Sequence, residues 1–322
     1  MIVRWGISQL DGVLRELGAS RPYVFASNRF DELPLDAAGR WTDLPTDRIA
    51  DVAEAVRELG ADALVAFGGG SAIDVGKAVS EAADLQLVSV PTTYSGAEWT
   101  TFYGVRDPNR RLRGGGGGAR TTAIVYEPQL TLGLPREETV GTALNALAHS
   151  AEALYVRERN DDADRRALVG AELIGAWLPR VVDAPGDVEA RTELLRGAAE
   201  AGAALGKSML GLGHAIAQAL GGRYGLPHGA MNALSLPPAL RFNEPAAPDA
   251  VARLGRALGS PDPAARVEEL ARLGGFERLR DFGVPAADLP EVAAAVVERA
   301  GAKSNPRQAS AGEVEELLRS IW

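Results

Sequence analysis

The chain has 322 residues and contains no cysteine. This excludes disulfide bonds, thiolate-bound metals and a cysteine nucleophile. Histidine is nearly absent as well, because the whole chain carries only His149, His214 and His228. Any chemistry that depends on imidazole is therefore confined to these three positions.

Long apolar segments and basic clusters are also missing. No apolar run approaches the roughly 20 residues that a bilayer-spanning helix needs, and residues 1–12 lack the basic and apolar pattern of a signal peptide. The formal net charge of −9 argues against nucleic acid or an anionic membrane as a partner. We expect a cytoplasmic protein that holds any anionic ligand in a local site.

The composition is typical of a globular protein, with 46% apolar and 24% charged residues, and the length of the chain suits two domains. Up to Leu134-Pro135, short apolar runs alternate with amphipathic segments, which predicts parallel βαβ units. Beyond that point, alanine- and leucine-rich stretches predict helices alone. We therefore predict an α/β domain over 1–135 and an all-α domain over 136–322. The strands expected in the first domain are 22–27, 63–67, 87–90 and 123–126, and the helices are 7–17, 46–59 and 73–83.

A run of glycines interrupts the α/β pattern. Five glycines, Gly114 to Gly118, follow one another among several arginines. Such a stretch predicts a mobile loop. It is either an insertion without order or a lid whose arginines, Arg110, Arg111 or Arg113, close on an anionic substrate.

A second glycine run, Gly68-Gly69-Gly70-Ser71, stands between a buried strand and a helix. Glycines let the backbone approach a pyrophosphate closely, and a helix N-terminus offers free N–H groups. Ser71 is expected at the N-cap, and Asp74 and Lys77 lie one turn apart on the helix that follows. The pattern predicts a nicotinamide-dinucleotide phosphate site; the alternative is a tight turn without a ligand.

Hydroxyl residues follow the next strand at the edge where ligands bind in an open parallel sheet. Thr92 and Thr93 come directly after the strand 87–90 and Pro91. An ST-turn that only stabilises the loop is the alternative. Taken with Gly68–Ser71, these residues favour a nucleotide crevice.

The choice between NAD and NADP depends on the end of the strand 22–27. The run there is Ser27-Asn28-Arg29, with no carboxylate before Asp31. Hydroxyl, amide and guanidinium groups accommodate a 2′-phosphate. This favours NADPH without excluding NADH; the alternative is a plain turn with Arg29 in solvent.

The motifs Gly68-Gly69-Gly70-Ser71-x-x-Asp74-x-x-Lys77 and Pro91-Thr92-Thr93-x-Ser95-Gly96-x-Glu98 resemble the iron-containing alcohol dehydrogenase superfamily, with the maleylacetate reductase branch as the closest match. The resemblance implies a dinucleotide-binding α/β domain, a helical domain and an active site between them, which is the dehydroquinate synthase-like architecture. Further matching segments are 126–135, 145–155, Leu226-Pro227-His228-Gly229 and Asn305-Pro306-Arg307.

The resemblance also raises the question of a metal. Metal-binding members of the family use one aspartate and three histidines, and the matching positions here are Asn145, His149, Gln218 and His228. Two neutral amides replace a carboxylate and an imidazole, which weakens binding of a divalent cation. We predict that no catalytic metal is bound; the alternative is a metal-dependent alcohol dehydrogenase that uses His149, His214 and His228.

Hydride transfer to a carbonyl develops negative charge on oxygen, and this charge needs a proton donor. His149 and His228 are the expected donors, with Asn145 and Gln218 holding the substrate by amide hydrogen bonds. Tyr94, Tyr155 and Tyr224 are further possible donors. A dicarboxylate substrate would also need cationic anchors, and the candidates are Lys207, Arg223, Lys303 and Arg307.

These features predict an NAD(P)H-dependent, metal-independent reductase of a small carbonyl or enoic acid substrate that resembles maleylacetate reductase. The broken ligand set leaves open a repurposed lyase, cyclase or binding protein on the same fold. The alanine- and leucine-rich helical faces favour a homodimer or larger assembly.

Overall fold

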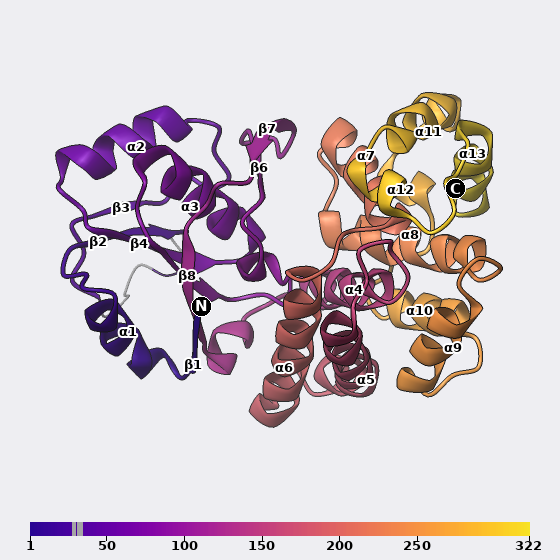
Figure 1. Cartoon of the computed structure of the whole chain (residues 1–322), viewed down its shortest axis with the longest axis horizontal. Helices are drawn as coiled ribbons and strands as arrows, with labels where there is room; N and C mark the ends of the chain where they lie inside the picture. Colours follow the sequence, from indigo (N-terminus) through magenta and orange to yellow (C-terminus); the bar gives the residue numbers. More distant parts are fainter. Residues whose placement is uncertain (28–29, 31–34) are drawn as a thin grey trace. The chain divides into compact units, whose positions relative to one another are not determined.

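The structure is a computed structural model that describes residues 1–27, 30 and 35–322. The chain divides into two compact units, one of residues 1–93 and 97–131 and one of residues 94–96 and 132–322 (Figure 1). The first is an α/β unit and the second is helical, as the sequence predicts. Within the described residues, none of the helices has both the length and the apolar character needed to cross a membrane.

The α/β unit is built on a six-stranded sheet of order β1-β8-β5-β4-β2-β3, and all neighbouring strands run parallel. The central pair is β4 and β5, which end side by side because Gly68 is paired with Pro91. The residues that follow these two strands therefore meet at one edge of the sheet. The strands are β1 Ile2–Trp5, β2 Pro22–Ala26, β3 Gly39–Trp41, β4 Ala63–Gly68, β5 Leu87–Pro91 and β8 Thr121–Tyr126.

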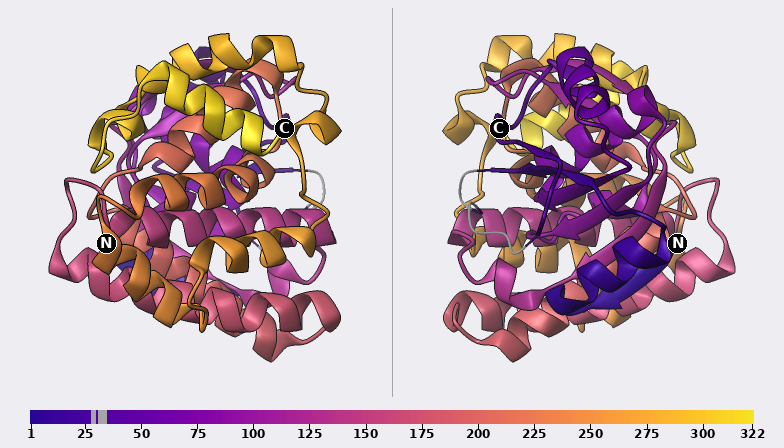
Figure 2. Two further views of the ribbon diagram at one scale, coloured as in Figure 1. Left: turned by 90° about the vertical axis from the view of Figure 1, so that its right-hand side faces the viewer. Right: turned by 90° about the vertical axis from the view of Figure 1, so that its left-hand side faces the viewer.

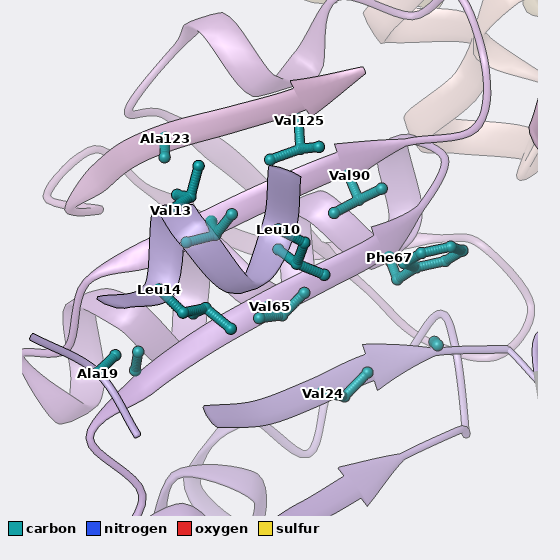
Figure 3. Close-up of a cluster of buried hydrophobic side chains, with 13 residues drawn as sticks. Leu10, Val13, Leu14, Ala19, Val24, Val65, Phe67, Val90, Ala123 and Val125 are labelled. Carbon is teal, nitrogen blue, oxygen red and sulfur yellow. The ribbon is translucent and has the colours of Figure 1, made fainter. Parts of the chain in front are cut away.

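Helices cover both faces of this sheet because successive strand side chains point to opposite sides. Val65 and Phe67 face α1 (Leu10–Glu16), as Figure 3 shows. Leu64 and Ala66 face the other way, toward α2 and α3. The remaining helices of this unit are η1 Ile7–Gln9, α2 Ile49–Glu58, α3 Gly70–Ala83, η3 Ala97–Trp99 and η4 Pro128–Thr131.

The prediction of a mobile loop at Gly114–Gly118 is wrong. Leu112–Gly116 forms strand β7, which pairs antiparallel with β6 (Tyr103–Arg106). The Tyr103 hydroxyl and the Gly118 N–H both donate to Glu81 Oε2, at 2.7 and 3.0 Å. Burial and the Glu81 carboxylate raise the pKa of Tyr103 to about 12. At Gly115, Gly116 and Gly118 the hairpin approaches its neighbours too closely for a larger residue, whereas Gly114 and Gly117 have open space around them.

This packing predicts different outcomes for two neighbouring glycines. An alanine Cβ at position 115 would lie 2.6 Å from the Tyr103 carbonyl oxygen, whereas one at 117 has no atom within 4 Å. We expect Gly115→Ala to destabilise the hairpin by about 1–3 kcal/mol, the usual cost of overpacking, and Gly117→Ala to have little effect. Amide hydrogen exchange of residues 103–116 measures the difference. Equal exchange in the two variants would contradict the close approach.

The helical unit confirms the predicted all-α character of the second half. Its long helix α4 contacts α5, α6 and α8, so it lies at the centre of the unit. Figure 2 (left) shows helices of this unit lying side by side. Their bounds are α4 Arg136–Ala153, α5 Asp161–Asp183, α6 Val188–Leu205, α7 Leu212–Tyr224, α8 His228–Asn243, α9 Pro248–Ala257, α10 Pro263–Arg272, η5 Leu279–Phe282, η6 Ala286–Asp288, α11 Leu289–Val297, α12 Ala300–Ser304 and α13 Ala311–Ser320.

Candidate functional site

The turn between β4 and α3 has the geometry of a phosphate site. Gly69 is the N-cap of α3 in an extended conformation, and Ser71 lies inside the first turn, so the predicted N-cap at Ser71 is wrong. A Cβ on Gly69 would lie 2.8 Å from Thr93 Cγ2, which explains why glycine precedes the helix. The first N–H groups of a helix have no partner within it. In α3 the Ala72 and Ile73 N–H groups donate to the Gly69 carbonyl oxygen at 3.0 and 3.2 Å, and the N–H groups of Gly70 and Ser71 suit an anion.

The two threonines flank this turn in different ways. The Thr92 N–H donates to the Gly68 carbonyl oxygen at 3.0 Å and so joins the two strand ends. Thr93 Oγ1 is buried and makes no hydrogen bond within the described residues. An unsatisfied buried hydroxyl beside a helix N-terminus suits a phosphate oxygen. The residues of this turn thus fit the pyrophosphate of a dinucleotide.

Lys77 does not belong to the phosphate site. Its side chain is 1% exposed, and Nζ donates to the Ala97 carbonyl, to Thr100 Oγ1 at 2.9 Å and to the Phe102 carbonyl at 3.0 Å. Asp74 is nearby, with Oδ1 3.8 Å from Nζ. Lys77 therefore fixes the segment 97–102 to α3, while the role of Asp74 in cofactor binding stays a prediction.

The segment that decides between NAD and NADP is described in part. Ser27 directly follows β2, whereas Asn28 and Arg29 lie outside the described residues. Arg40 in β3 reaches this segment, because its Nη2 donates to the Ser27 carbonyl at 3.4 Å and also to the Phe30 carbonyl. Sequence reasoning missed Arg40, which holds the backbone on which Ser27 stands.

In the helical unit, the structure brings the three histidines together into one histidine cluster: His149 from α4, His214 from α7 and His228 from α8. The His149 and His214 rings stack with centroids 4.7 Å apart and an interplanar angle of 14°. The His214 and His228 centroids are 5.8 Å apart. Asn145, one turn before His149 on α4, reaches the same cluster.

Two asparagines link the cluster to the backbone in what we call the amide chain. Asn145 Nδ2 donates to the Ser95 carbonyl oxygen at 2.7 Å. Asn232 Nδ2 donates to Asn145 Oδ1 at 2.7 Å and lies 3.1 Å from His228 Nε2. Asn232 was not selected from the sequence. The available signal was its position four residues after His228, on the same face of α8.

Glu152 is the other residue that sequence reasoning left without a role. Its side chain is fully buried, and it accepts hydrogen bonds from the Gly211 N–H at 2.6 Å, the His214 N–H at 3.0 Å and His214 Nδ1 at 2.7 Å. The opposite nitrogen, His214 Nε2, lies 3.3 Å from Asn145 Oδ1. Both ring nitrogens thus face oxygen atoms, which fixes the orientation of His214.

Gly96 brings the segment 94–96 against the cluster. Its φ of 71° is a left-handed conformation that favours glycine. A Cβ there would lie 3.2 Å from His149 Nδ1 and 3.2 Å from Gly202 Cα. Glycine is therefore required for the loop that presents the Ser95 carbonyl to Asn145.

The structure places the other predicted site residues differently. Gln218, one turn after His214 on α7, is half-buried and takes no part in the hydrogen bonds above. Tyr94 Oη accepts from Arg191 at 3.2 Å. Tyr224 donates to Asp288 at 2.7 Å, and its burial with this bond raises its pKa to about 12. Burial beside Glu152 raises the pKa of Tyr155 well above its usual value.

The four candidate cationic anchors all form ion pairs with carboxylates. The pairs are Lys207–Asp162 at 2.7 Å, Arg223–Glu291 at 2.7 Å, Lys303–Glu298 at 3.2 Å and Arg307–Glu313 at 2.6 Å. None of these carboxylates belongs to the hydrogen-bonded network around the histidine cluster. The structure gives no support for these side chains as substrate anchors.

The residues present do not fit a divalent cation. Within the described residues, no group of three or more histidine, aspartate or glutamate side chains is arranged to hold one. Asn145 Oδ1 already faces two nitrogens, from Asn232 and His214. The carboxylate of Glu152 is engaged with His214 and the Gly211 N–H. A site whose amide and carboxylate oxygens are committed to hydrogen bonds has little affinity for such a cation.

Comparison with known proteins shows the family of this chain. Residues 38–123 match the family described as iron-containing alcohol dehydrogenase, and residues 139–322 match its C-terminal domain. Maleylacetate reductase 2 of Cupriavidus pinatubonensis is 35% identical over 96% of this chain and 90% of its own length. Maleylacetate reductase of Sphingobium indicum is 36% identical over 85% and 78%.

Solved structures show the same relationship. The maleylacetate reductase of Agrobacterium tumefaciens superposes with a TM-score of 0.89 at 31% identity, covering all of this chain and 95% of that one. A putative alcohol dehydrogenase from Ralstonia eutropha gives 0.91 at 34% identity, with coverage of 100% and 95%. The chain is therefore an NAD(P)H-dependent oxidoreductase that belongs to the iron-containing alcohol dehydrogenase superfamily, in its maleylacetate reductase branch.

Proposed function

We propose that this oxidoreductase reduces a small unsaturated or keto dicarboxylate of the maleylacetate class, and that it does so without a metal ion. The observation that carries the proposal is Asn145. It stands where metal-binding relatives are expected to have a carboxylate, and hydrogen bonds engage both ends of its amide. The substrate class rests on the relatives named maleylacetate reductase.

The first unit supplies the groups that would hold the cofactor. The N–H groups at the start of α3 and the hydroxyls of Ser71 and Thr93 suit the pyrophosphate. Reduced nicotinamide supplies a hydride equivalent. NADPH is the preferred form in this proposal, because the polar segment that begins at Ser27 favours a 2′-phosphate.

The second unit supplies the groups that stabilise the product. Reduction of a carbonyl, or of a double bond conjugated to one, places negative charge on a substrate oxygen. An N–H group of His228 stabilises that charge and provides the proton, since imidazole is suited to this role near neutral pH. His149 is 5% exposed and stacked on His214, so it supports the orientation of the cluster, while His228 is half-buried.

Metal removal tests this proposal. We expect protein dialysed against EDTA, with its metal content measured by mass spectrometry, to oxidise NADPH or NADH with maleylacetate as fast as untreated protein. A metal-dependent alcohol dehydrogenase treated in parallel serves as the control and should lose activity. Loss of activity that Fe²⁺ or Zn²⁺ restores would contradict metal independence. Failure to oxidise either cofactor with maleylacetate, in treated and untreated protein alike, would contradict the substrate class.

A further inference from the structure

The amide chain has a defined direction, because one end of it is a backbone carbonyl. A carbonyl oxygen only accepts hydrogen bonds, so the atom of Asn145 that lies 2.7 Å from the Ser95 oxygen is its NH₂ group. The reverse orientation would place two acceptor oxygens against each other. Asn145 therefore presents its oxygen, Oδ1, toward Asn232.

The same reasoning fixes Asn232. The atom of Asn232 that lies 2.7 Å from Asn145 Oδ1 must be a donor, and is therefore Nδ2. This orientation leaves Asn232 Oδ1 buried without a hydrogen-bond partner in the described part of the chain. A buried oxygen without a hydrogen bond costs free energy, so the neighbouring groups must impose this orientation of the Asn232 amide. Asn232 is fully buried, so water cannot stabilise the opposite orientation of its amide.

The contact between Asn232 and His228 determines the tautomer of His228. Besides Asn145 Oδ1, Asn232 Nδ2 lies 3.1 Å from His228 Nε2 and 3.3 Å from the His228 carbonyl oxygen, to which it donates. An amide nitrogen only donates hydrogen bonds, so a hydrogen on His228 Nε2 would face another donor, whereas a bare Nε2 can accept from Nδ2. In a neutral imidazole, one nitrogen accepts and the other carries the hydrogen. We infer that Asn232 is a positioning residue that holds neutral His228 in the tautomer with the hydrogen on Nδ1.

This tautomer decides which edge of the ring is a donor. A free histidine side chain prefers to carry its hydrogen on Nε2, so the amide chain reverses the intrinsic preference. If His228 is the donor in the proposed reduction, on which this consequence rests, the proton comes from Nδ1, a buried atom that the substrate oxygen must reach. Asn232 then acts through His228 and needs no contact with the substrate.

Nitrogen NMR tests the tautomer without any assay of activity. The chain has only three histidines, so ¹⁵N-labelled protein gives few imidazole signals, and a His228→Gln variant identifies those of His228. The spectrum is taken well above the ordinary histidine pKa of about 6.5. We expect Nδ1 of His228 to be the protonated nitrogen. Protonation on Nε2 in the unaltered protein would overturn the inference, whatever the enzyme reduces.

Substitution of Asn232 provides the second measurement. A carboxylate at this position can only accept a hydrogen bond, so Asn232→Asp should move the hydrogen of His228 to Nε2. Ser235→Ala, one turn further along α8 and also buried, is the matched control and should leave the tautomer unchanged. An unchanged tautomer in folded Asn232→Asp protein would overturn the role of Asn232.

Kinetics separates this inference from the proposed function. With maleylacetate as substrate, we expect Asn232→Asp to lower kcat by about 10- to 100-fold, the effect seen for residues that orient metal-bound histidines, with the KM for NADPH unchanged. A shifted tautomer with full kcat would contradict the use of Nδ1–H in catalysis. If the unaltered protein does not reduce maleylacetate, the proposed function fails while the NMR result stands.

Discussion

Replacement of His228 by alanine is expected to lower kcat by about 10²- to 10⁴-fold, the range typical of a general acid or base, and to leave the affinity for NADPH unchanged. The imidazole of His228 is the half-buried member of the histidine cluster and begins α8. The residues expected to hold the cofactor phosphates, Gly69 to Ser71 and Thr93, lie in the other compact unit. Loss of the imidazole therefore removes charge stabilisation and the proton without removing contacts to the nucleotide.

Steady-state kinetics with maleylacetate and fluorescence titration with NADPH measure the two quantities separately. Ser235→Ala, on the same helix, is the control for general effects of altering α8 and should keep the kcat of the unaltered protein. A His228→Ala enzyme with unreduced kcat would show that another group delivers the proton. A weakened affinity for NADPH with normal kcat would instead give His228 a role in cofactor binding.

Much of the fold can be predicted from the sequence, because buried strands appear in it as runs of apolar residues. The apolar runs 22–27, 63–67, 87–90 and 123–126 predict strands that the structure confirms as β2, β4, β5 and β8, since strands buried on both faces must be continuously apolar. The edge strands β1 and β3 were missed because their residues are only half-buried or exposed. Strand β7 was missed because two of its glycines, Gly115 and Gly116, lie in close contact with Tyr103 across the hairpin, which composition does not reveal.

Only part of the site could be predicted from the sequence. The family resemblance paired Asn145 with His149, four residues apart on one helix, and the structure places both in the histidine cluster with His228. Glu152 and Asn232 were not predicted, because their hydrogen-bond partners lie elsewhere in the chain. Glu152 accepts from Gly211 and His214, and Asn232 donates to Asn145. Long-range contacts of buried polar groups require the folded structure. For Asn232 the local signs were its position in an apolar stretch, after Met231, and its spacing of four residues from His228.

Glu152 shows how strongly this polar centre depends on one buried charge. Its carboxylate satisfies three donors, two of them backbone N–H groups at the start of α7. The surrounding glycines leave it just enough space, because a Cβ on Gly213 would lie 3.0 Å from Glu152 Oε1. Removing one partner of a buried ionic contact leaves the others unsatisfied in a medium of low polarity.

We therefore expect Glu152→Ala to lower the free energy of unfolding by about 3–5 kcal/mol and the Tm by on the order of 10 °C, measured by circular dichroism on heating. Glu152→Gln keeps an oxygen that can accept from the backbone, so it should lose less. The matched control is Glu158→Gln, a change at an exposed glutamate of the same unit whose carboxylate accepts a hydrogen bond from Ser304 Oγ. If Glu152→Ala and Glu158→Gln unfold at the same temperature, the carboxylate of Glu152 does not hold α4 and α7 together, and the orientation of His214 must depend on Asn145 alone.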